Sequence, residues 1–231
     1  ALAAAADAET KAARGNSMQV AQHRREATEA LDRLRTFRDG GEGYRAVVAL
    51  IRAGRAGYWF EELAAATWVP DLGLEELLIT AAKEARPQGP SIQAAILALG
   101  AADTPKARDY LLDVLSESSD PVAGMFAARA LGKWEERRAV PSIGVRLRQP
   151  EYADARFTLL NALGGIGGPE ATSILVEFVR DGLPEETYYA LANLAIVDRA
   201  LARAEAGALR AGHASRLNKP TSELIDRLLR E

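Results

Sequence analysis

Cysteine is absent from this chain of 231 residues, and histidine occurs only twice, as His23 and His213. Without cysteine there are no disulfides, no thiolate-ligated metals and no thiol catalysis. Neither histidine has a second histidine three or four residues away, which favours two surface residues over metal ligands. We therefore expect no metal and no cofactor. These absences favour a protein that is not an enzyme, although they leave that question open.

Long apolar runs and an excess of basic charge are missing as well. Arg, Glu or Gly interrupts each apolar stretch well before the roughly 18 residues that a membrane span needs. The sequence therefore predicts no membrane insertion. The 29 Lys and Arg residues are balanced by 32 Asp and Glu, for a net charge of −3. Nucleic-acid binders usually carry a basic excess, so the charge argues against a nucleic-acid partner.

A period of 32 residues is the strongest signal that the sequence does contain. Leu-Gly pairs occur at residues 99–100, 131–132 and 163–164. Three further columns share this interval: Ala107, Ala139 and Ala171; Leu111, Ile143 and Leu175; Leu115, Leu147 and Val179. Such self-similarity predicts a repeat architecture, which grows along one axis instead of outward from one core.

Each unit contains two helical patterns. In its first half, small and apolar residues recur at helical spacing, as at Ala155, Leu159 and Leu163, and the second half repeats the pattern. Helix starts are expected at Asp120-Pro121, Pro169 and Pro184. Gly132 and Gly164 fall where first helices should end, where a left-handed cap or a close backbone approach suits glycine, and residues 164–168 are expected to form a turn. The sequence thus predicts an all-α fold, an α-solenoid of antiparallel helix pairs.

The units resemble HEAT-like repeats of the short, phycobilin-lyase type, within the ARM-like superfamily. One unit carries the matching motifs Asp-Pro at 120–121, Ala-Ala-Arg-Ala-Leu-Gly at 127–132 and Ala-Val-Pro at 139–141. The next carries Asn-Ala-Leu-Gly-Gly-Ile-Gly at 161–167 and Pro-Glu-Ala at 169–171. The pattern departs at Gly124, Ile92 and Tyr188. Proteins with such repeats include adaptors, chromophore lyases, DNA glycosylases and an iron-dependent hydroxylase, so the resemblance implies a fold and leaves the function open.

Three regions follow from these patterns. The HEAT-like array is expected over residues 41–212, with its best match over 91–183. Residues 1–40 are expected to form an N-terminal helical segment, and residues 213–231 a C-terminal capping helix with Thr221 or Ser222 near its cap. The start Ala1-Leu2-Ala3 predicts a fragment or a mature form left after signal cleavage. The compartment therefore stays open between the cytoplasm and the periplasm or exterior.

Two columns of residues outside the core predict a binding strip. The resemblance implies that the Ala-Leu-Gly helices line the concave side of the array. Steps of 32 residues along these helices give Gln93, Met125, Phe157 and Tyr189, and one turn further on they give Leu97, Arg129, Asn161 and Asn193. Positions four apart share a helix face, so the columns form one strip. An apolar strip with a polar rim is typical of protein recognition, although these side chains would also suit imperfect packing between helices.

These patterns predict a non-enzymatic scaffold or adaptor that binds a protein partner through its concave face. A lyase-type protein that handles a chromophore is the alternative, with Tyr188, Tyr189 and Arg156 as polar contacts, and a small-molecule ligand therefore stays open. A DNA-binding HEAT-like protein is a weaker third interpretation. Glu135-Glu136 and the arginines near residues 137–148 are expected on solvated helix faces.

Overall fold

The structure, a computed structural model, describes residues 75, 76, 79, 80, 83, 96, 99, 100, 103–212 and 217–230. Every regular element among these residues is helical, which confirms the predicted all-α class. The chain divides into two compact units, Ala1–Tyr110 and Leu111–Glu231. In the first unit, the carboxylate of Glu75 accepts a hydrogen bond from the backbone amide of Ala107 at 2.8 Å. The expected N-terminal segment 1–40, with His23, lies outside the described residues, as does His213.

Seven α-helices and two short 3-10 helices follow one another in the described range 103–212, and an eighth α-helix lies in the range 217–230. They are α7 (Pro105–Glu117), α8 (Pro121–Lys133), η2 (Arg137–Ala139), α9 (Val140–Leu147), η3 (Pro150–Ala155), α10 (Arg156–Ile166), α11 (Gly168–Asp181), α12 (Pro184–Val197), α13 (Arg199–Gly212) and α14 (Lys219–Arg230). Helix α8 starts as predicted, because the carboxylate of Asp120 accepts a hydrogen bond from the amide of Val122 at 2.9 Å.

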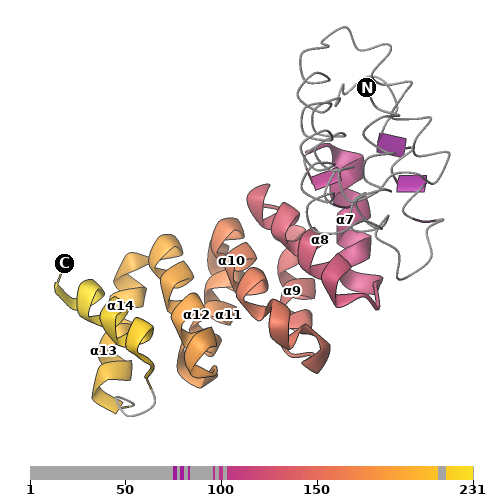
Figure 1. Cartoon of the computed structure of the whole chain (residues 1–231). Helices are drawn as coiled ribbons and strands as arrows, with labels where there is room; N and C mark the ends of the chain where they lie inside the picture. Colours follow the sequence, from indigo (N-terminus) through magenta and orange to yellow (C-terminus); the bar gives the residue numbers. More distant parts are fainter. Residues whose placement is uncertain are drawn as a thin grey trace, which may run out of the picture. The chain divides into compact units, whose positions relative to one another are not determined.

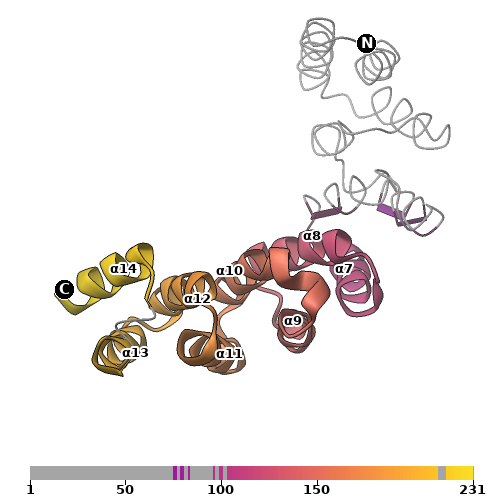
Figure 2. The ribbon, with the colours of Figure 1, turned by 60° about the horizontal axis from the view of Figure 1, so that its bottom comes forward.

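The helices of the second unit form two layers (Figures 1 and 2). Helices α8, α10, α12 and α14 lie side by side in one layer, the A layer, and α9, α11 and α13 form the other, the B layer. Two of the B helices each pack against two A helices: α11 contacts α10 and α12, and α13 contacts α12 and α14. This stacking of helix pairs is the α-solenoid arrangement that the 32-residue period predicts.

The core of the second unit lies between these layers. Leu131, Ile143, Leu163 and Leu175, which the periodicity predicts as core residues, are fully buried. Leu131 and Leu163 come from consecutive A helices, and Ile143 and Leu175 from consecutive B helices. Burial therefore repeats with the same period as the sequence.

The periodic glycines bring neighbouring A helices together. A β-carbon at Gly132 would lie 2.7 Å from the Cα of Ala162, and one at Gly164 would overlap the side chain of Asn193. Such distances are too short for any residue larger than glycine unless the helices separate. The sequence left two roles open for these glycines, a left-handed helix cap or a close approach of the backbone to its neighbour. The structure shows the close approach.

The expected turn over residues 164–168 is wrong in its first half. Helix α10 continues through Gly164 and Gly165 to Ile166, and the chain turns at Gly167, whose φ of 64° suits glycine. The last helix is capped by an earlier residue than expected. It starts at Lys219, and Asn218 rather than Thr221 or Ser222 caps it, since the Asn218 Oδ1 accepts a hydrogen bond from the Thr221 amide at 2.9 Å.

Ion pairs join successive repeats along the B layer of the second compact unit. Arg148 donates a hydrogen bond to Glu177 of α11 at 2.5 Å, and Arg180 donates one through its Nε to Glu205 of α13 at 2.9 Å. Arg148 and Arg180 stand 32 residues apart, so equivalent arginines reach the next B helix twice, although they pair with glutamates at different positions in it. Glu205 is buried, with 5% of the residue exposed, and the Arg180 guanidinium supplies its partner.

Two charged residues that were expected to be solvated are part of the packing. The Arg146 guanidinium donates hydrogen bonds to backbone carbonyls at the C-terminal end of α7, including that of Leu115 at 2.8 Å. The carboxylate of Glu136 is buried and accepts a hydrogen bond from the Arg138 Nε at 2.9 Å. The expectation failed because carbonyls at a helix end attract a guanidinium, and because a carboxylate can cap the short helix η2.

Candidate functional site

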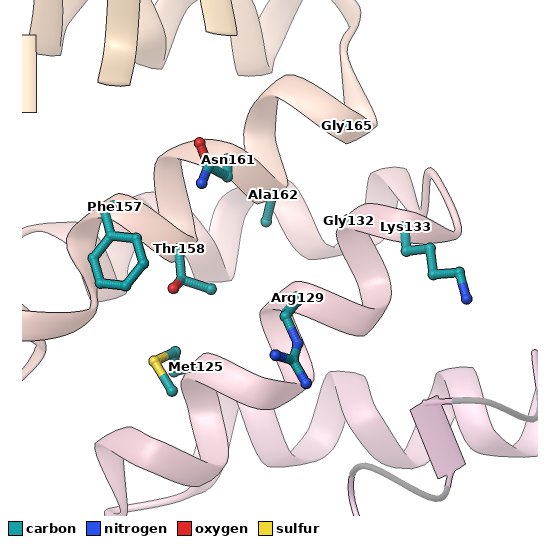
Figure 3. A pocket seen from close by; sticks show the side chains of 9 residues that line it. All are labelled: Met125, Arg129, Gly132, Lys133, Phe157, Thr158, Asn161, Ala162 and Gly165. Carbon is teal, nitrogen blue, oxygen red and sulfur yellow. The ribbon is translucent and has the colours of Figure 1, made fainter. Parts of the chain in front are cut away.

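A groove of about 460 Å³ runs between α8 and α10 on the A layer (Figure 3). It is lined by Met125, Arg129, Gly132, Lys133, Phe157, Thr158, Asn161, Ala162 and Gly165. Four of these nine belong to the two columns that the sequence predicts as a binding strip. The columns therefore face a hollow between adjacent repeats in this pair of helices. We call this feature the A-layer groove.

Small residues form the floor of the A-layer groove. Gly132 and Ala162 are buried at the closest approach of α8 and α10, and a β-carbon at Gly165 would lie 2.7 Å from the carbonyl oxygen of Gly132. The absence of side chains lets the two backbones nearly touch at this end. Larger side chains stand on the helices at the other end, where Met125 and Phe157 face one another across the groove (Figure 3).

Apolar side chains continue from the groove onto the next helix. Phe157 is 47% exposed, which is unusual for so large an apolar residue. Its ring lies 5.8 Å from that of Tyr189 on α12, and the Tyr189 ring lies 5.3 Å from that of Tyr188 in an edge-on contact. Met125, Tyr188 and Tyr189 are half-buried. We call Met125, Phe157 and Tyr189, one from each of three successive A helices, the A-layer strip.

The polar column divides into exposed and buried members. Arg129 and Asn161 are exposed in the groove, whereas Asn193 is buried at 6% exposure. The Asn193 Nδ2 donates hydrogen bonds to the Asn161 Oδ1 at 2.7 Å and to the Tyr189 carbonyl at 2.8 Å. Asn193 was expected on the rim of the strip. It is instead buried, and its two hydrogen bonds fix the side chain of Asn161 and the carbonyl of Tyr189.

Arg156 lies apart from the groove lining, although it was expected to contact a ligand in the chromophore hypothesis. Its Nη1 pairs with Glu186 at 2.6 Å and its Nε donates to the Leu147 carbonyl at 3.0 Å. Both charged side chains are largely buried. The arrangement joins the start of α10 to the start of α12. Gln93 and Leu97, the first members of the two columns, lie outside the described residues.

Two basic side chains, Arg129 and Lys133, line the A-layer groove, and its other lining residues are uncharged. Arg129 rests over the Phe126 ring at 4.9 Å, and Lys133 stands one turn further along α8. Among the described residues, neither cation has a carboxylate partner. Lys133 and Thr158 line the groove, but the sequence did not predict them as binding residues. The spacing of four between Arg129 and Lys133 on one helix was the signal that could have found Lys133.

The layers and the groove define an all-helical repeat protein of the α-solenoid class. Residues 110–195 match the family of HEAT repeats, so this part of the chain consists of HEAT-like repeats. Proteins of this kind generally serve as scaffolds for protein interaction. Searches of curated proteins and of solved structures returned no match. Within the described ranges, no helix has the length and apolar character needed to cross a membrane.

Proposed function

We propose that this protein is a non-enzymatic binding scaffold that recognises a protein partner with the A-layer strip and the adjoining A-layer groove. One observation carries the proposal: three successive A helices each present an apolar side chain at the same register. Phe157 among them is half exposed to solvent. Exposed aromatic residues beside a groove are typical of the centre of a protein interface, where a few anchors supply most of the binding energy.

The chemistry of the groove supports binding over catalysis. Its lining contains no carboxylate, histidine or thiol, which are the groups most often used for acid–base and nucleophilic steps. Among the described residues, no cluster of three or more His, Cys, Asp or Glu could hold a metal ion. Arg156, the residue nominated for contact with a chromophore, is engaged by Glu186. No observation favours the chromophore or DNA-binding alternatives.

The strip is tested by replacing its three residues with aspartate. Met125→Asp, Phe157→Asp and Tyr189→Asp together should abolish capture of the partner from an extract of the source cells, measured by pull-down and mass spectrometry. Helicity and melting temperature should stay close to those of the wild type, because none of the three is fully buried. Capture that survives the triple substitution would exclude the strip as the interface.

The control adds aspartate at two exposed apolar residues elsewhere. Val145 on α9 and Leu183, the residue that precedes α12, are each 59% exposed and lie outside the groove lining. Val145→Asp with Leu183→Asp should leave partner capture intact. Loss of capture in this control as well would mean that added negative charge, and not the strip, decides the result.

A further inference from the structure

The A-layer groove has an uncompensated positive end. Arg129 and Lys133 are both exposed, lie one helical turn apart on α8, and have no ion pair with any described residue. No Asp or Glu lines the groove. Elsewhere in the second unit, arginines such as Arg156 and Arg180 are paired with glutamates of the next repeat. A cationic pair without counter-charges in a chain of net charge −3 favours a partner that brings carboxylates.

The opposite end of the groove is apolar. Met125 and Phe157 stand at one end of the lining, and Lys133 and Gly165 at the other, as Figure 3 shows. Between them, Asn161 has its Oδ1 occupied by the Asn193 amide at 2.7 Å, which directs its own NH₂ group to act as a donor. The groove thus offers an apolar contact at one end, a hydrogen-bond donor and a positive charge near its middle, and a second positive charge at the other end.

The spacing along α8 matches that of an extended peptide. An α-helix rises about 1.5 Å per residue, so Arg129 and Lys133 lie about 6 Å and 12 Å from Met125 along the axis. An extended chain advances about 3.3 Å per residue and alternates its side chains, so residues two and four positions apart cover about 7 Å and 13 Å on one face. An apolar side chain and two acidic ones at alternate positions therefore fit the groove in register.

We infer that the partner of this groove is an extended acidic peptide segment, with an apolar residue separated by two and four positions from Asp or Glu, in either chain direction. This inference rests on the proposed function and adds the chemistry of the partner to it. A nucleic acid is a poorer match, because two cations neutralise few phosphates and Met125 and Phe157 would be left without an apolar contact.

The test screens the full chain against a displayed library of random 12-residue peptides. Peptides retained by the wild type should be enriched in Asp or Glu two and four positions from Phe, Leu, Ile or Met. Their binding should weaken as the salt concentration rises, because the charges are exposed. Retained peptides without acidic residues at this spacing would overturn the inference.

Charge reversal provides the second arm. Arg129→Glu with Lys133→Glu should weaken the enriched peptides by about tenfold or more. The same variant should select Lys or Arg at the positions where the wild type selects Asp or Glu. Arg203→Glu with Arg227→Glu, on α13 and α14, makes the same change in net charge outside the groove and should leave the selection unchanged. Identical selection by the wild type and the groove variant would overturn the inference.

The screen separates the inference from the proposed function. Met125→Asp with Phe157→Asp should abolish retention of the enriched peptides. Peptide retention could be lost in this variant and yet unchanged by Arg129→Glu with Lys133→Glu. That result would support the A-layer strip as the binding surface and reject the acidic partner. Retention unaffected by substitutions at Met125 and Phe157 would reject both, whereas no peptide retained at all would reject the extended acidic peptide and leave the strip to the partner-capture test.

Discussion

Two glycine-to-alanine substitutions should have opposite effects on stability although the chemical change is the same. At Gly132, the added β-carbon would lie 2.7 Å from the Cα of Ala162, and α10 is held from its other side by α12. At Gly207, within α13, no atom beyond its chain neighbours and the backbone of its own helix lies within 4 Å of the new β-carbon. Alanine is the better helix former at both positions, so the surroundings decide the sign.

The magnitudes follow from packing and from helix propensity. Overpacking of a core contact costs about 1–3 kcal/mol, and the propensity gain offsets up to about 1 kcal/mol, so Gly132→Ala should lose about 1–2 kcal/mol. Gly207→Ala should gain about 0.5–1 kcal/mol. At about 2–4 °C per kcal/mol for a chain of this size, the first variant should melt about 2–8 °C lower and the second about 1–4 °C higher.

Thermal unfolding followed by circular dichroism at 222 nm compares the two variants with the wild type. Gly132→Ala should also weaken partner binding, since Gly132 is part of the groove floor and a separation of α8 and α10 would reshape the groove. Equal stabilisation by both substitutions would show that the two A helices are not in contact at Gly132.

Three further substitutions test the packing. Leu163→Ala removes a fully buried side chain and should lower the free energy of unfolding by about 2–5 kcal/mol, measured by urea denaturation. Arg156→Ala should cost about 1.5–3 kcal/mol in the same measurement, because Glu186 and the Leu147 carbonyl lose a charged donor, and an unchanged midpoint would contradict that role. Tyr152→Phe should raise stability by about 1 kcal/mol at pH 7, because the buried Tyr152 hydroxyl has no hydrogen-bond partner among the described residues. Burial raises the pKa of Tyr152 above 10.0, so the wild type should lose stability as the pH rises above this value and the advantage of Tyr152→Phe should grow, whereas a constant difference would contradict the burial.

The 32-residue period predicted the features that every unit repeats. Equivalent residues occupy equivalent environments in a solenoid, so Leu131 and Leu163 are both buried, and Met125 and Phe157 both line the groove. The helix starts at Asp120 and Pro184 were predictable for a different reason, since capping depends on residues adjacent in the sequence.

Contacts between neighbouring units were not predictable from that period. Arg156 meets Glu186 thirty residues later, and Gly132 meets Ala162 at the same separation, so these partners do not stand in one column. Their positions depend on how far each helix is displaced and rotated relative to the next. Asn193 is buried while Asn161 in the same column is exposed. This difference could not be predicted, because the spacing of residues in the sequence does not show which side chains of the next repeat a residue contacts.

The B-layer ion pairs give the array a direction. Each unit supplies an arginine toward the unit that follows it and a glutamate toward the unit before it, as Arg148, Glu177, Arg180 and Glu205 do. A second copy of residues 150–181 inserted after residue 181 would therefore place Arg180 of the first copy opposite Glu177 of the second. Arg148 and Glu205 would keep partners of opposite charge at the outer ends. Lengthening by duplication would thus create no mismatched seam, and the surface offered to a partner could grow by one helix pair at a time.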